Sequence, residues 1–89
     1  MEKLYIFQAT SQRNEFLSGL FIANEANVQE AIGKCLFFGK ILGKHNNICI
    51  ILRETDIKLI TDDQEFIAKA KIYGLHRIGY NPLNYLLSE

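Results

Sequence analysis

KLYIFQA, residues 3–9, alternates as a β-strand does, but it is apolar on both sides. Leu4 and Ile6 fall on one face of such a strand, and Tyr5 and Phe7 fall on the other. Strands that carry apolar residues on both faces are covered on both. The stretch therefore predicts a central, well-covered strand.

Further strands and helices are expected on the C-terminal side of this strand. Strands outnumber helices and many connections are short, which favours an antiparallel sheet. We expect residues 1–89 to form one α+β domain, with a mostly antiparallel sheet of about five strands, two helices packed on one face and a short C-terminal helical turn. The further predicted strands are residues 19–23, 34–39, 47–53 and 57–61. The two helices are expected directly after Asn24 and after Thr61, and the final turn is expected to begin at Asn81-Pro82.

The second helix, over residues 62–74, has the clearest signals in the chain. Asp62 and Glu65 have the spacing of a capping box, and Gly74 is a typical helix end. The predicted buried stripe consists of Phe66, Ile67, Ala70 and Tyr73.

The charge balance excludes some classes of partner. Ten basic and ten acidic side chains give zero formal net charge over 89 residues, which makes a dedicated duplex nucleic-acid binder unlikely. The charges are unevenly placed along the chain. Residues 31–53 contain Lys and Arg without a carboxylate, and the charged residues in 54–65 are acidic except for Lys58. Solvated strand ends and helix caps explain this pattern best, and a basic, anion-facing edge is the alternative.

The two cysteines, Cys35 and Cys49, each lie in an apolar run. The chain begins directly with a strand-like segment, and no apolar stretch approaches the length of a membrane span. We therefore expect no membrane partner, a cytoplasmic protein (in the host cytoplasm if phage-encoded) and two reduced thiols.

The stretch FFGKILGKHNN, residues 37–47, is a candidate anion site. Its glycines allow close approach to a ligand, and its basic side chains supply donors. A Walker pattern is absent, so a strand followed by a basic turn is the preferred interpretation. The candidate ligand-binding residues are Lys40, Gly43, Lys44, His45, Arg77 and Tyr80.

Other chemistry finds little support in the residue spacing. His45, Cys49, Cys35 and His76 show no spacing typical of a structural metal site, so no metal and no cofactor is expected. A nucleophile elbow or Cys–His signature is also missing, so we expect no enzyme and no catalytic residues. If exposed, Tyr73, Tyr80 and Tyr85 could anchor a protein or stack on bases. The preferred interpretation is that Tyr73 and Tyr85 complete small cores and that Tyr80 braces the GYNPL turn.

Several short motifs resemble one family when they are taken together in chain order. SGLF, AIGK, FGKILGKH, TDDQEFI and GYNPLNYL, spread over residues 18–87, resemble small proteins of phages and mobile elements. That group carries a Ser after the His and an acid after FG, where this chain has Asn46 and Lys40, so roles tied to those two positions do not carry over. The resemblance implies a phage-encoded context and does not imply a mechanism.

Phage-encoded proteins of this size are often inhibitors or decoys. The resemblance therefore implies a similar role for this chain. The first hypothesis is a small non-enzymatic inhibitor or adaptor that binds another protein, or itself as a homo-oligomer, through a sheet edge or a tyrosine-bearing surface. The alternative is a sponge for a nucleotide or another phosphate-bearing anion, held by the basic residues 40–45. A small nucleotide hydrolase ranks third.

Overall fold

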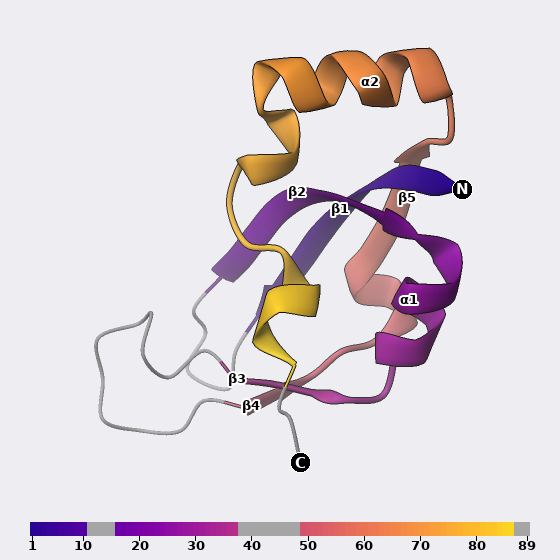
Figure 1. Ribbon diagram of the computed structural model, residues 1–89. Coiled ribbons are helices and arrows are strands. Elements are labelled where there is room, and N and C mark those ends of the chain that lie inside the picture. Colours follow the sequence, from indigo (N-terminus) through magenta and orange to yellow (C-terminus); the bar gives the residue numbers. More distant parts are fainter. Residues whose placement is uncertain (11–15, 38–48, 87–89) are drawn as a thin grey trace.

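The computed structural model describes residues 1–10, 16–37 and 49–86, and its central element is the strand expected from KLYIFQA (Figure 1). Strand β1 (Glu2–Thr10) lies between two antiparallel neighbours in the sheet order β2-β1-β5. The other strands are β2 (Phe16–Asn24), β5 (Ile57–Thr61) and a separate antiparallel pair, β3 (Cys35–Phe37) with β4 (Cys49–Ile51).

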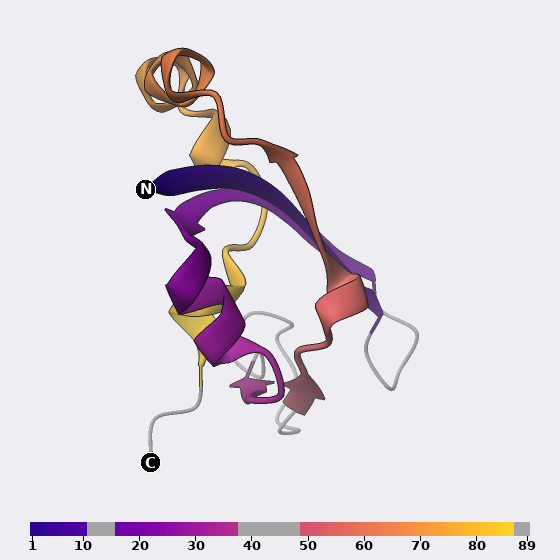
Figure 2. The ribbon, with the colours of Figure 1, turned by 90° about the vertical axis from the view of Figure 1, so that its right-hand side faces the viewer.

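The three-stranded sheet is curved, and its inner, concave face carries the main core (Figure 2). Phe7 and Phe21 are fully buried there, and Tyr5 stacks on Phe21 with ring centroids 5.3 Å apart. The cover comes from helix α1 (Glu25–Ala31), from the β3–β4 pair and from the C-terminal segment. Odd-numbered positions of β1 and β2 therefore face this core, as the period of two in a strand requires.

Helix α2 (Gln64–Tyr73) lies on the opposite, convex face, at the end where β1 begins (Figure 2). Its buried residues, Ile67 and Ala70, pack outside the main core, as does Leu4 of β1. The N-cap is Asp63, whose carboxylate accepts a hydrogen bond from the Glu65 backbone N–H at 3.0 Å. The predicted cap at Asp62 was thus one residue early.

The α+β class, the five strands, the two helices and the C-terminal turn are confirmed. Two details of the prediction were wrong. The strands form two sheets because β3 and β4 pair only with each other, and the helices cover opposite faces because β1 is apolar on both. Three short 3₁₀ helices complete the fold, namely η1 (Glu54–Asp56), η2 (Leu75–Arg77) and η3 (Pro82–Tyr85).

The C-terminal segment is tied to the outer edge of β2 by two glycines. Gly79 bridges Gly19, and the Tyr80 N–H donates to the Ser18 carbonyl at 3.0 Å. A Cβ atom on Gly19 would lie 2.3 Å from the Tyr80 backbone, and one on Gly79 would lie 2.2 Å from the Ser18 oxygen. Only glycine allows these two backbones to touch. The motifs SGLF and GYNPL, which are far apart in sequence, therefore meet in space.

The disulfide state of Cys35 differs from the prediction. Cys35 is disulfide-bonded, and the only other cysteine of the sequence is Cys49, on the paired strand β4. Strands β3 and β4 are separated in sequence, and their antiparallel pairing brings the two strands together. Because disulfides persist mainly in oxidising compartments, the cysteine content no longer argues for a cytoplasmic location. Within the described ranges, no helix has the length and apolar character needed to cross a membrane.

Replacing Gly79 with alanine should destabilise the protein far more than replacing Gly74. The two glycines have nearly equal positive φ angles, 73° and 75°, but a Cβ meets backbone only at Gly79. We expect Gly74→Ala to cost about 1–2 kcal/mol in the free energy of unfolding. Gly79→Ala should cost about 2 kcal/mol more, because of the added clash. Urea unfolding of both variants checks this, and equal losses would contradict the contact.

Alkaline pH should unfold the protein partly through Tyr5. Burial raises the pKa of its hydroxyl above the ordinary 10.0, although the nearby Lys3 acts in the opposite direction. A raised pKa in the folded state means that the unfolded chain releases the proton first, so stability falls as the pH rises beyond about 10.

The Tyr5→Phe variant should therefore lose less stability than the wild type between about pH 9 and pH 11 in urea titrations. Tyr73→Phe, at an exposed ring, is the matched control and should follow the wild type. Identical pH profiles for wild type and Tyr5→Phe would refute the role of this hydroxyl.

Candidate functional site

Of the six residues predicted to bind an anion, the structure describes Arg77 and Tyr80. Lys40, Gly43, Lys44 and His45 lie outside the described residues, so the predicted basic site is neither confirmed nor contradicted. Arg77 is exposed at the end of η2. The Tyr80 ring packs against the main core and makes an edge contact with Tyr85, with ring centroids 5.9 Å apart. The Tyr80 ring is thus engaged in packing.

The three candidate tyrosines divide into two kinds. Tyr85 is partly buried against the core, as its structural interpretation predicted, and Tyr80 is partly buried there as well. Tyr73 is 77% exposed, so the prediction that it belongs to the buried stripe of α2 was wrong. Phe66, at the other end of the same stripe, is 46% exposed. Only Ile67 and Ala70 of that stripe reach the body of the protein.

The orientation of α2 explains why half of its stripe is uncovered. Gln64 and Lys71, seven residues apart, share one side of the helix, and both hold Glu2. The Gln64 side chain donates to the Glu2 carbonyl at 2.8 Å, and Lys71 pairs with the Glu2 carboxylate. Glu2 begins β1, so this side of α2 points toward the start of that strand. Phe66 and Tyr73 lie on the other side of the helix from Glu2.

Beyond α2 and the short η2, which contacts β2, no described helix lies over the convex face of the sheet (Figure 2). Ile6 and Leu20 lie opposite each other on neighbouring strands of this face, and both are half-buried. Lys58 of β5 is exposed and lies opposite Ile6. Lys69 falls between Phe66 and Tyr73 on the helix, at spacings of three and four residues that place it on the same side. We call this the convex surface, and its residues are Ile6, Leu20, Lys58, Phe66, Lys69 and Tyr73.

The charged side chains at the convex surface have both signs, because Glu65 precedes Lys69 by four residues and lies on the same side of α2. Lys58 and Lys69 make no ion pair within the part of the chain that the structure describes. The described positions of β1 and β2 on this face carry one acidic side chain, Glu2, which is neutralised by Lys71. The acidic residues Asp62, Asp63 and Glu65 are gathered around the start of α2.

The outer edge of β5 is the second candidate for protein binding. In the described ranges no segment pairs with this edge, and the alternation of the ladder directs the backbone groups of Ile57 and Leu59 outward. The strand has only five residues, carries Lys58 at its middle position and has a register shift near Thr61. Short length, a lysine and a bulge are the devices by which natural sheets prevent strand addition. The edge is therefore a poor docking strand.

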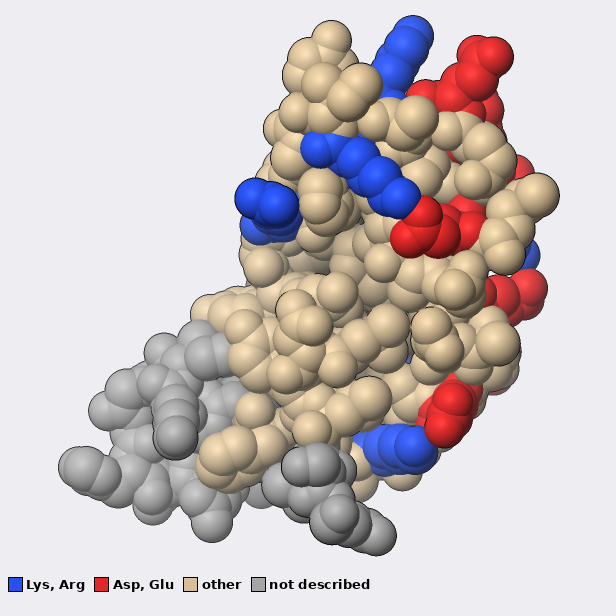
Figure 3. Space-filling model, viewed as in Figure 1, with Lys and Arg blue, Asp and Glu red and all other residues tan. Residues whose placement is uncertain are grey.

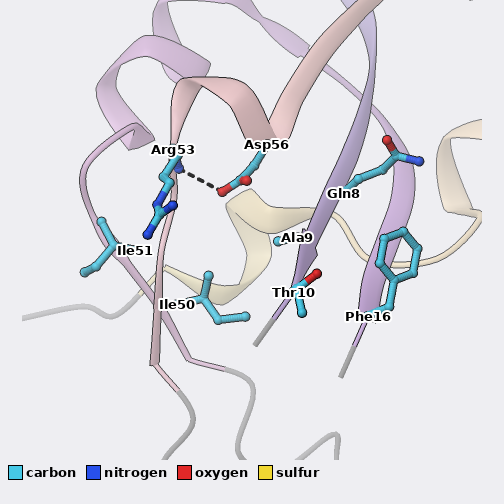
Figure 4. Close-up of a pocket in the computed structure, with 8 residues that line it drawn as sticks. All are labelled: Gln8, Ala9, Thr10, Phe16, Ile50, Ile51, Arg53 and Asp56. Atoms are coloured by element: carbon cyan, nitrogen blue, oxygen red, sulfur yellow. Dashed lines mark hydrogen bonds between the residues drawn. The ribbon is translucent and has the colours of Figure 1, made fainter. Parts of the chain in front are cut away.

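An open cleft of about 410 Å³ lies between the ends of β1 and β4 (Figure 4). Its charged groups are Arg53 and Asp56, and the Asp56 carboxylate accepts a hydrogen bond from the Arg53 backbone N–H at 3.0 Å. Gln8 and Phe16 project away from these two residues in Figure 4. One cation, one anion and diverging polar groups do not form an anion site or a catalytic site.

Metal ligands are also not gathered in the ranges described. No group of three or more His, Cys, Asp or Glu side chains there could hold a metal ion. His76 is partly buried, and its Nδ1 is enclosed without a hydrogen-bond partner among the described residues. The absence of an enzymatic activity stays a prediction.

The uneven charge along the sequence serves mainly local structure. Asp63 caps α2, Asp56 caps η1, and Lys34 lies 3.8 Å from Glu30 one helical turn earlier. On the face seen in Figure 3, basic and acidic side chains both gather around α2 and the start of β1. This face has no extended field of one sign such as a nucleic-acid binder presents.

The exposed and buried halves of the α2 stripe should differ sharply in their effect on stability. Tyr73→Ser should change the free energy of unfolding by less than about 0.5 kcal/mol, because the ring already contacts water. Ile67→Ala should cost about 2–5 kcal/mol, because that side chain is 2% exposed. Urea unfolding measures both values, and a loss at Tyr73 equal to that at Ile67 would show that the ring is part of a core.

No protein-family model, no curated protein and no solved structure matches this chain. The functional argument therefore depends on the geometry of the described residues.

Proposed function

We propose that this protein is a small non-enzymatic interaction protein, an inhibitor or an adaptor, that binds another protein through its convex surface. The observation that carries the proposal is the exposure of Phe66 and Tyr73 on α2, together with the half-buried Ile6 and Leu20 on the convex face that α2 only partly covers. Water-exposed aromatic rings next to an incompletely covered apolar face are typical of protein-binding sites.

The energetics favour binding over a purely structural role for these side chains. An apolar stripe on a helix stabilises a fold only where it is covered, and two of the four stripe residues of α2 are covered. Tyrosine and phenylalanine remove large apolar areas from water when a partner covers them, at low cost in side-chain entropy. The exposed rings therefore contribute more to a complex than to the free protein.

The sheet edge is the weaker alternative for the binding surface. Its short length, its central Lys58 and its irregular register oppose the addition of a strand from another protein. A side-chain surface needs no free backbone groups, so the same features do not affect docking on the convex surface.

Site-specific photo-cross-linking in cells that naturally contain the protein tests the proposal. A photoreactive phenylalanine analogue placed at position 73 should give discrete cross-linked protein adducts after irradiation. The same analogue at position 30 is the matched control, because the Glu30 side chain is 73% exposed but lies on α1, away from the convex surface. Adducts at position 73 that are no more abundant than at position 30 would refute the proposal.

A further inference from the structure

We infer that the disulfide at Cys35 is a redox-sensitive clamp, which keeps the β3–β4 pair closed over the concave core and lets that pair open when a dithiol reduces it. The clamp acts on the cover of the concave face, so it is independent of the function proposed for the convex surface. Three features support this role, which are the place of the bond, the small size of the β3–β4 ladder and the core that the ladder covers.

Cys35 lies on the outer side of the β3–β4 pair. Leu36 and Ile50, which are directly opposite each other, belong to the main core and are 0% and 8% exposed. Neighbouring residues of a strand point to opposite sides, so Cys35 and its cross-strand neighbour Ile51 face away from that core. Cys35 is half-buried, and Ile51 is 52% exposed. A reductant can therefore approach this side, and disulfides near solvent are typically the reducible ones.

The disulfide ties the first residue pair of the described ladder to the last. Cys35 pairs with Ile51 at one end of the ladder, and Cys49 pairs with Phe37 at the other end. A covalent bond between the two cysteines thus spans all of the residue pairs between β3 and β4. Its loss affects the whole ladder.

The ladder has little other backbone support. Each strand has three residues, and neither strand joins the β2-β1-β5 sheet. Two strands alone are marginally stable, and Leu36 adds one isolated bridge, to Leu86. The disulfide closes the chain over residues 35–49, and closing a loop of about 15 residues disfavours the opened state on the order of 100-fold.

The β3–β4 pair covers the concave core with aliphatic side chains. Leu36 and Leu52 are fully buried in the same cluster as Phe7 and Phe21, and the pair lies on the concave side, apart from the three-stranded sheet (Figure 2). Opening of the pair therefore uncovers this core locally. The β1–β2 ladder and the contact of β2 with the C-terminal segment use other residues and should stay closed.

Reduction of the clamp is a two-electron thiol–disulfide exchange. One thiolate of the dithiol attacks a sulfur of the disulfide, which releases one cysteine and forms a mixed disulfide. The second thiolate of the dithiol then displaces the other cysteine. Each cysteine sulfur gains one proton, and the dithiol leaves as a cyclic disulfide. The concave cover is thus expected to be held closed in an oxidising compartment and to open in a reducing one.

Amide hydrogen exchange, followed by NMR with and without dithiothreitol, tests the clamp. The Gly33 N–H donates to the Leu52 carbonyl at 2.8 Å, and the Leu52 N–H donates to the Lys34 carbonyl at 3.0 Å. Both groups lie where the chain enters β3 and leaves β4, so they report the opening of the pair. Their exchange should become on the order of 100-fold faster after reduction.

Two amides on β2 and the C-terminal segment are the matched controls. The Leu20 N–H donates to the Ile78 carbonyl at 2.8 Å. The Tyr80 N–H donates to the Ser18 carbonyl at 3.0 Å. Both should change by less than about threefold, because this contact opens separately from the β3–β4 pair.

The variant Cys35→Ser/Cys49→Ser separates loss of the bond from other effects of the reductant. Without dithiothreitol it should exchange like the reduced wild type, and dithiothreitol should not change it further. Intact mass before and after reduction confirms the oxidation state of the wild type. Two thiols in the protein before reduction, unchanged exchange at Gly33 and Leu52, or equal acceleration at Leu20 and Tyr80 would each overturn the inference. None of these outcomes affects cross-linking at position 73, so the proposed function is tested separately.

Discussion

Burial of one face of a strongly curved three-stranded sheet organises this protein. Phe7 and Phe21 are completely buried on the concave face, and most other elements are arranged to cover them. Helix α1, the β3–β4 pair and the C-terminal segment all contribute side chains to that one core. A chain of 89 residues can build little more than one such core, because small domains bury a limited share of their surface. The convex face therefore receives only α2.

The contact between Gly19 and Gly79 completes this arrangement. It brings the C-terminal segment against the outer edge of β2, so that this edge is closed by backbone hydrogen bonds. From there η3 reaches the core, where Tyr85 and Leu86 pack. The same contact anchors the chain just beyond α2 and η2. The position of α2 at one end of the convex face thus depends on its two attachments, one at Glu2 and one at the glycine pair.

Unequal cover of the two faces provides a physical basis for recognition. The concave face is closed by the protein itself, whereas the convex surface combines half-buried aliphatic side chains, exposed rings and two lysines that form no ion pair with the described residues. Such a surface offers apolar area for affinity and charge for orientation. The other candidate regions lack this combination, since the cleft near Arg53 has balanced charge and the edge of β5 is protected against strand addition.

The local sequence by itself determined the identity of most elements. Alternation in KLYIFQA predicted the central strand, Gly74 marked the end of α2 in the left-handed conformation, and Asn81-Pro82 marked the start of η3 through a side-chain cap. These features depend on neighbours along the chain, so composition and spacing are enough to find them.

Only the tertiary structure decided which apolar side chains are buried and where the surface lies. Helical periodicity gave Phe66, Ile67, Ala70 and Tyr73 one common stripe, but the hold of Gln64 and Lys71 on Glu2 set the rotation that buries only the middle two. The meeting of Gly19 with Gly79, the disulfide at Cys35 and the opposite placement of the helices likewise join segments distant in sequence. Periodicity shows that a helix has an apolar side, and the packing of distant segments determines how much of that side is covered.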